Sequence, residues 1–76
     1  MLKKIWESMT GDQRNQVISA LILDGASSSA VYAWVRGERV PRKLYRNAFS
    51  RYINRYTGQT TTPEELWPES SEEAKD

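Results

Sequence analysis

The segment that decides the fold is Gly25–Pro41, with the sequence GASSSAVYAWVRGERVP. Gly25 can adopt the positive φ that ends a preceding helix. Ser27 or Ser28 can cap a new helix, because a serine oxygen accepts a hydrogen bond from one of the unpaired backbone N–H groups. Gly37 is a natural stop for that helix. The segment therefore predicts a tight turn, a short helix and a basic loop that ends at proline.

The predicted short helix has two unlike sides. Val31 and Trp34 form a narrow apolar seam with Ala30 beside it, so we expect this side to face the core. The other side carries short polar side chains together with Tyr32 and Arg36. Short side chains let a helix backbone approach another surface closely, so this side suits a DNA groove better than a core.

Two helices joined by a short glycine-containing turn are typical of a helix-turn-helix, whose second helix contacts base edges in the major groove. The side chains expected to face bases are Ser28, Ser29, Tyr32 and Ala33. The side chains expected to contact phosphates are Ser27, Arg39, Arg42, Lys43 and Arg46. Alternatively, Ser28 and Ser29 act only as helix caps. Arg51 and Arg55 are interpreted as solvated flanks of the following helix.

The N-terminal third predicts two helices. The apolar residues Leu2, Ile5, Trp6 and Met9 have the spacing of one helical stripe. Thr10 and Gln13 can form a capping box for a helix from about Gly11 to Leu23. The apolar side of this second helix consists of Val17, Ile18, Leu21 and Ile22.

The C-terminal half predicts one long helix, a docked turn and a tail. The helix extends from Arg42 to Tyr56, and its apolar positions are Leu44, Tyr45, Ala48, Phe49, Tyr52, Ile53 and Tyr56. Thr62 before Pro63 can cap a last short turn, which Leu66 and Trp67 would dock. We expect an all-α bundle of about four helices plus this turn, with a domain over residues 1–68 and a disordered acidic tail over 69–76.

The composition narrows the function. The chain of 76 residues has no cysteine and no histidine, so it lacks thiolate ligands and the commonest general base at neutral pH. We expect no enzyme activity, no cofactor, no metal and no small-molecule ligand. No stretch approaches the roughly 20 apolar residues of a membrane-spanning helix. We also expect no secretion signal and a cytoplasmic location.

Charge is distributed unevenly along the chain. Residues 34–56 contain seven arginines and lysines and one acid, whereas residues 57–76 contain one lysine and six acids. Such a basic block favours a polyanionic partner, and the acidic end is most simply a solubilising tail. A sharper hypothesis is that the acidic tail folds back on the basic block and competes with DNA.

The segment Gly25–Pro41 resembles the pattern GVSxxxVSxWxxGxxxP of Cro-type phage repressors and the related YdaS-like regulators. The matching residues are Gly25, Ser27, Val31, Trp34, Gly37 and Pro41. The ending TGQTTTPEELWPE is similar to the TGGxVTxEELRPD ending of those chains, so the resemblance covers roughly residues 16–69. It implies a lambda-repressor-like fold and adds Arg36 to the base-contacting positions. The chain departs from the pattern at Asp24, Ala26 and Tyr32.

These observations predict a sequence-specific regulator that binds double-stranded DNA and occludes a promoter or operator. A homodimer on a two-fold operator, with half-sites about 34 Å apart, would increase the affinity of so small a domain. Leu66, Trp67 and the aromatic face of the long helix are candidates for the dimer surface. The alternatives are a protein-protein interaction module, such as an antitoxin-like partner or a small inhibitor, and a sequence-blind nucleic-acid binder.

Overall fold

The computed structural model describes residues 2–68, and these residues form helices with no strand among them. The elements are α1 (Leu2–Ser8), α2 (Gly11–Leu23), α3 (Ser28–Arg36), α4 (Lys43–Thr57) and α5 (Pro63–Leu66). This confirms the all-α bundle, and the predicted terminal turn is the four-residue helix α5. The hypotheses on residues 69–76 lie outside the described residues.

The helix ends form where the sequence places capping residues. Thr10 and Gln13 make a reciprocal capping box at the start of α2, with Gln13 N–H to Thr10 Oγ1 at 3.1 Å. Thr62 and Glu65 make a second box at α5. Gly37 ends α3 in the left-handed conformation, in which a residue without Cβ has no steric penalty. Local sequence therefore sets these three boundaries.

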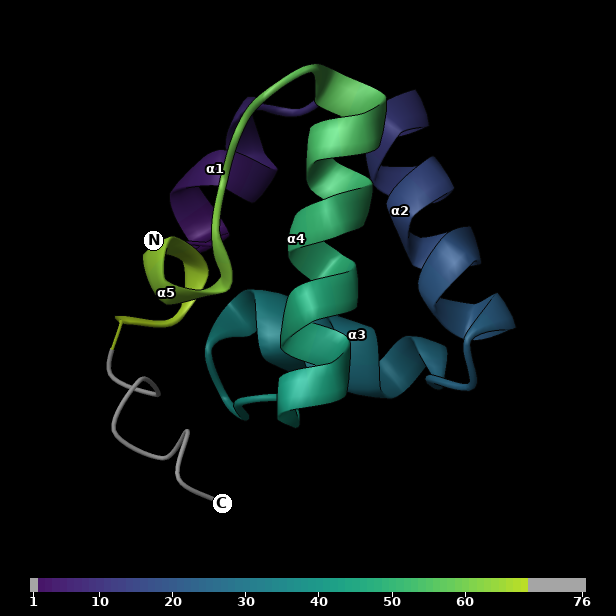
Figure 1. Cartoon of the computed structure of the whole chain (residues 1–76). Helices are drawn as coiled ribbons and strands as arrows, with labels where there is room; N and C mark the ends of the chain where they lie inside the picture. The colour runs from purple at the N-terminus through teal and green to yellow at the C-terminus, as the bar shows by residue number, and fades with distance from the viewer. Residues whose placement is uncertain (1, 69–76) are drawn as a thin grey trace.

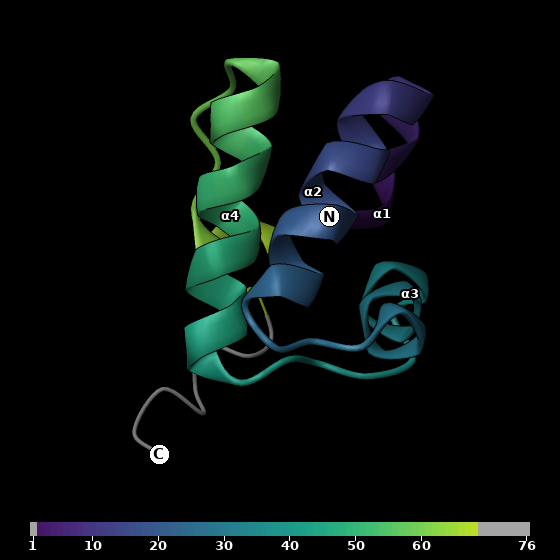
Figure 2. The ribbon, with the colours of Figure 1, turned by 90° about the vertical axis from the view of Figure 1, so that its right-hand side faces the viewer.

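The helices pack in a way that leaves one side of α3 uncovered. α2 and α4 lie side by side and make the most extensive contact in the bundle. α3 lies crosswise near the C-terminal end of α2 and the N-terminal end of α4 (Figure 1). Figure 2 shows α3 nearly end-on, next to α2 and apart from the axis of α4. The short helix α1 packs against α3, and α5 packs against α4.

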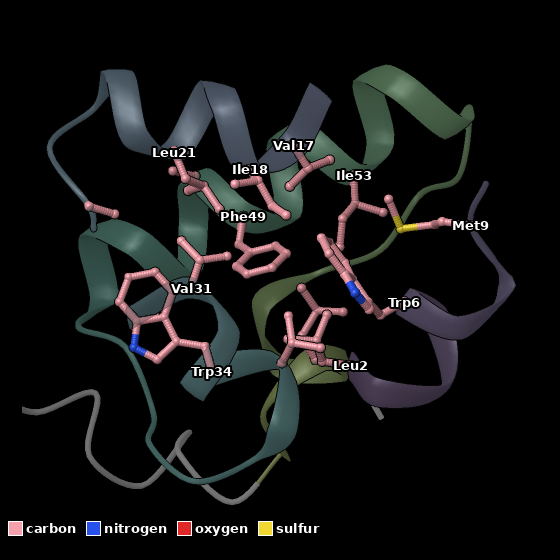
Figure 3. Close-up of a cluster of buried hydrophobic side chains, with 14 of the residues drawn as sticks. Leu2, Trp6, Met9, Val17, Ile18, Leu21, Val31, Trp34, Phe49 and Ile53 are labelled. Carbon is pink, nitrogen blue, oxygen red and sulfur yellow. The ribbon is translucent and has the colours of Figure 1, made fainter. Parts of the chain in front are cut away.

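The core is built around Phe49 of α4, which is fully buried. Its ring contacts Trp6 edge-on at a centroid distance of 5.8 Å and Trp67 at 5.6 Å. Trp34 lies 6.5 Å away on another side. Figure 3 shows Phe49 between the apolar side chains of α2 and those of α1 and α3. Four helices and the segment after α5 therefore meet at one side chain.

Three expectations about apolar positions are wrong. Ile22 is 43% exposed, because the buried side of α2 is narrower than the sequence pattern indicates. Leu44 is 69% exposed, although Tyr45 and Arg46 in the same first turn of α4 are half-buried and buried. Leu66 and Trp67 are buried against this chain's own core, so neither is a dimer surface.

No helix among the described residues is long and apolar enough to span a membrane.

Candidate nucleic-acid interface

The turn between α2 and α3 is held in place by α4. Gly25 has φ +112°, and the Ala26 N–H donates to the Leu21 carbonyl oxygen at 3.0 Å. From α4, the Tyr52 hydroxyl donates to Asp24 Oδ2 at 2.6 Å and the Tyr45 hydroxyl to the Asp24 carbonyl oxygen at 3.4 Å. Two tyrosines thus fix the point from which α3 starts.

The side of α3 that is left uncovered is polar. Ser28, Tyr32 and Arg36 are exposed at intervals of four residues, so they lie on one face of the helix, and Ser29 is exposed beside them. This stripe spans about 12 Å at 1.5 Å per residue, the length of three to four stacked base pairs. We call these four side chains the α3 stripe.

The opposite side of α3 packs on the core and includes one predicted contact residue. Val31 and Trp34 are buried and Ala30 is half-buried, as expected for the core side, and Val35 is buried as well. Ala33 is only 6% exposed, so the expectation that it faces bases is wrong. The buried side of α3 is therefore wider than the Val31–Trp34 seam and includes Ala33.

Ser27 is the residue that caps α3. Its Oγ accepts a hydrogen bond from the Ala30 N–H at 3.1 Å. Its Oγ also lies 3.5 Å from Ser29 Oγ, within reach of a hydrogen bond in which either hydroxyl can donate. Ser28 has no role in the cap, so its exposed side chain belongs to the α3 stripe alone.

The predicted phosphate-binding residues separate into two groups. Arg39, Arg42 and Lys43 are exposed in the loop after α3 and at the start of α4. Arg46 is only 8% exposed, and its Nη1 donates to the Pro41 carbonyl oxygen at 2.7 Å. The prediction that Arg46 contacts a phosphate is therefore wrong, because the side chain bends back to hold the Pro41 carbonyl of the loop between α3 and α4.

Arg36 has a partner that sequence reasoning missed. Its Nε donates to Glu38 Oε2 at 2.9 Å and its Nη2 to Glu38 Oε1 at 3.1 Å. This pair lowers the pKa of Glu38, first through the hydrogen bonds and then through the charge of Arg36. The signal in the sequence was a pair of opposite charges on either side of Gly37, where a left-handed glycine turns the chain back on itself.

The described residues contain no group of three acidic, histidine or cysteine side chains that could hold a metal ion. A search of protein-family models, curated proteins and solved structures found no match to this chain.

Proposed function

We propose that this protein is a sequence-specific DNA-binding regulator that uses α2 and α3 as a helix-turn-helix. The observation that carries the proposal is the α3 stripe, a polar helix face that the core leaves uncovered near three exposed cations, Arg39, Arg42 and Lys43. A helix of this kind fits the major groove, and its serine and tyrosine hydroxyls can donate to or accept from base edges. The three cations would contact the phosphates on either side.

Charge supports the assignment of roles within this surface. Arg36 and Glu38 form the only ion pair among residues 2–68, so no acidic side chain of these residues pairs with Arg39, Arg42 or Lys43, although Arg42 lies over the Tyr45 ring. When such cations bind phosphates, counterions condensed on the DNA are released, and this release gives affinity without sequence preference. The α3 stripe, in contrast, would provide the preference.

The test is selection of bound sequences from random duplex DNA, with affinities measured at two salt concentrations. We expect an enriched motif with two-fold symmetry. Tyr32→Ala should change the preferred sequence, whereas Arg39→Ala should weaken binding to all sequences alike and reduce the salt slope by about one. Arg55→Ala, at the other end of α4, is the matched control and should leave the affinity nearly unchanged.

Salt-dependent binding without an enriched motif would instead indicate a sequence-blind binder, and it would contradict the proposal.

One observation favours a protein-protein interaction module as a second candidate. Leu23 is 87% exposed at the end of α2, and Ile22 and Leu44 are also exposed. If the chain acts as such a module, it should not bind DNA even at low salt. Leu23→Ser and Leu44→Ser should then abolish partner binding without loss of folding.

A further inference from the structure

The Arg36–Glu38 pair lies on the exposed end of the α3 stripe. The two side chains are 55% and 59% exposed, yet they meet through two parallel hydrogen bonds. A planar guanidinium matched to a carboxylate in this way has a fixed orientation, whereas a free arginine side chain samples many rotamers. The arrangement therefore orients Arg36 in the absence of a ligand.

The backbone makes this geometry reproducible. The Glu38 N–H donates to the Ala33 carbonyl oxygen at 2.9 Å, and the Gly37 N–H donates to the Trp34 carbonyl oxygen at 3.1 Å. These are the two bonds of a Schellman motif, which the left-handed Gly37 allows. The motif holds Glu38 over the last turn of α3, where its carboxylate meets the Arg36 side chain.

The pair leaves a specific set of donors unused. A guanidinium has five N–H groups, and Glu38 takes the one on Nε and one on Nη2. The remaining Nη2–H and one Nη1–H point in parallel from the far edge of the guanidinium plane, and the other Nη1–H points back toward Cδ. Two donors on one edge match the O6 and N7 acceptors of guanine, the commonest specific arginine contact in the major groove.

The charge of the pair favours a base over a phosphate. Arg36 and Glu38 together carry no net charge at neutral pH, and the guanidinium holds the pKa of Glu38 below its usual value. A neutral pair gains little from a phosphate and would place a carboxylate near the DNA backbone. A base edge is uncharged, so hydrogen-bond geometry decides the contact there.

We propose that Arg36 reads a guanine and that Glu38 is the positioning residue that holds it for this contact. This inference rests on the DNA-binding function proposed above. It makes Glu38 a determinant of specificity, although its charge opposes binding to DNA in general.

The test is Glu38→Gln, because positioning and electrostatics predict opposite results. Removal of a negative charge should strengthen binding to random-sequence duplex at low salt. Loss of the second carboxylate oxygen should at the same time reduce the preference for guanine at one position of the selected motif by about ten-fold. Glu64→Gln, an exposed residue of α5, makes the same charge change and should keep the guanine preference.

Arg36→Ala identifies the position that is read. It should remove the guanine preference at that same position, and adding Glu38→Gln in this background should change the preference no further. If Glu38→Gln alone strengthens binding and keeps the guanine preference, the positioning role is wrong while the DNA-binding function stands. A wild-type motif whose guanines do not depend on Arg36 would also overturn it. Absence of any wild-type motif would overturn both proposals together.

Discussion

Gly25 shows how a single residue sets the geometry of the candidate interface. Its φ of +112° is a conformation that side chains with a Cβ rarely adopt. A Cβ at this position would also lie 3.0 Å from the Tyr45 hydroxyl oxygen. The turn that starts α3 is therefore both sterically tight and restricted in its backbone.

We expect Gly25→Ala to lower the free energy of unfolding by about 1–2 kcal/mol, because the backbone must hold an unfavourable φ. Gly37→Ala is the matched control, since Gly37 also has a positive φ but a Cβ there would meet nothing within 4 Å. Urea unfolding of both variants measures how much the contact with Tyr45 adds, and Gly25→Ala should lose more stability than Gly37→Ala. An equal loss in the two variants would show that the contact with Tyr45 adds nothing.

Tyr52 gives a pH dependence with a definite sign. The pKa of its phenol is raised, mainly because the hydroxyl donates to Asp24 and then because of burial, while Arg51 opposes the shift. The unfolded chain therefore loses this proton at lower pH, near 10, than the folded chain does. The stabilisation by this bond is complete below about pH 10 and is lost as the pH rises through the folded pKa.

The comparison of wild type with Tyr52→Phe tests this. The difference in the free energy of unfolding should be constant between about pH 7 and 9 and should shrink above about pH 10. In Asp24→Asn, the tyrosinate absorbance of Tyr52 should appear at lower pH than in the wild type. A constant difference up to pH 11 or so would mean that Tyr52 and Asp24 are not coupled.

At the scale of one element, the stability of α3 depends more on its capping residues than on the helix propensity of its sequence. It has nine residues, and helices of that length are not stable alone in water. Ser27 supplies the N-terminal hydrogen bond and Gly37 the left-handed end. The core side chains then fix the helix against α1 and α2.

Ser27→Ala should lower the free energy of unfolding by about 1 kcal/mol, because the Ala30 N–H loses its partner. Ser28→Ala is the control: it removes a hydroxyl that caps nothing, and it should leave stability within about 0.5 kcal/mol of the wild type. Thermal or urea unfolding decides between them. A larger loss of stability for Ser28→Ala than for Ser27→Ala would show that Ser28, and not Ser27, caps α3.

At the scale of the whole molecule, stability depends on how α3 is joined to the rest. Trp34 is 7% exposed and packs on Tyr45 at a centroid distance of 5.4 Å as well as on Phe49. It therefore connects the candidate interface to the centre of the bundle. A change at this position should affect folding and the placement of the α3 stripe together.

Trp34→Ala should lower the free energy of unfolding by about 3–5 kcal/mol, because it leaves a cavity beside Phe49. This is a large fraction of the stability of a domain of this size. Trp34→Phe should retain most of the wild-type stability, and the two variants can be compared by urea unfolding. Cooperative unfolding at a wild-type midpoint in Trp34→Ala would contradict the core role of this side chain.

The sequence alone determined both ends of α2, the end of α3 and the start of α5, because caps and glycines act on neighbouring backbone groups. The Thr10–Gln13 box and the stop at Gly37 were predictable and are confirmed, whereas the sequence offered both Ser27 and Ser28 as the cap and the structure assigns it to Ser27. The core role of Trp34 and Phe49 followed equally from helical spacing. These features depend on residues that are close together in the chain, so they can be predicted from a single sequence.

Only the tertiary structure decided which side chains remain accessible. Arg46 looks like its neighbours Arg42 and Lys43 in the sequence, yet it is buried on the Pro41 carbonyl. Ala33 is buried because a wide face of α3 packs on the bundle, and Leu44 is exposed although Tyr45 and Arg46 in the same turn of α4 are not. Exposure depends on how helices pack against one another across long stretches of sequence, and helical spacing does not contain that information.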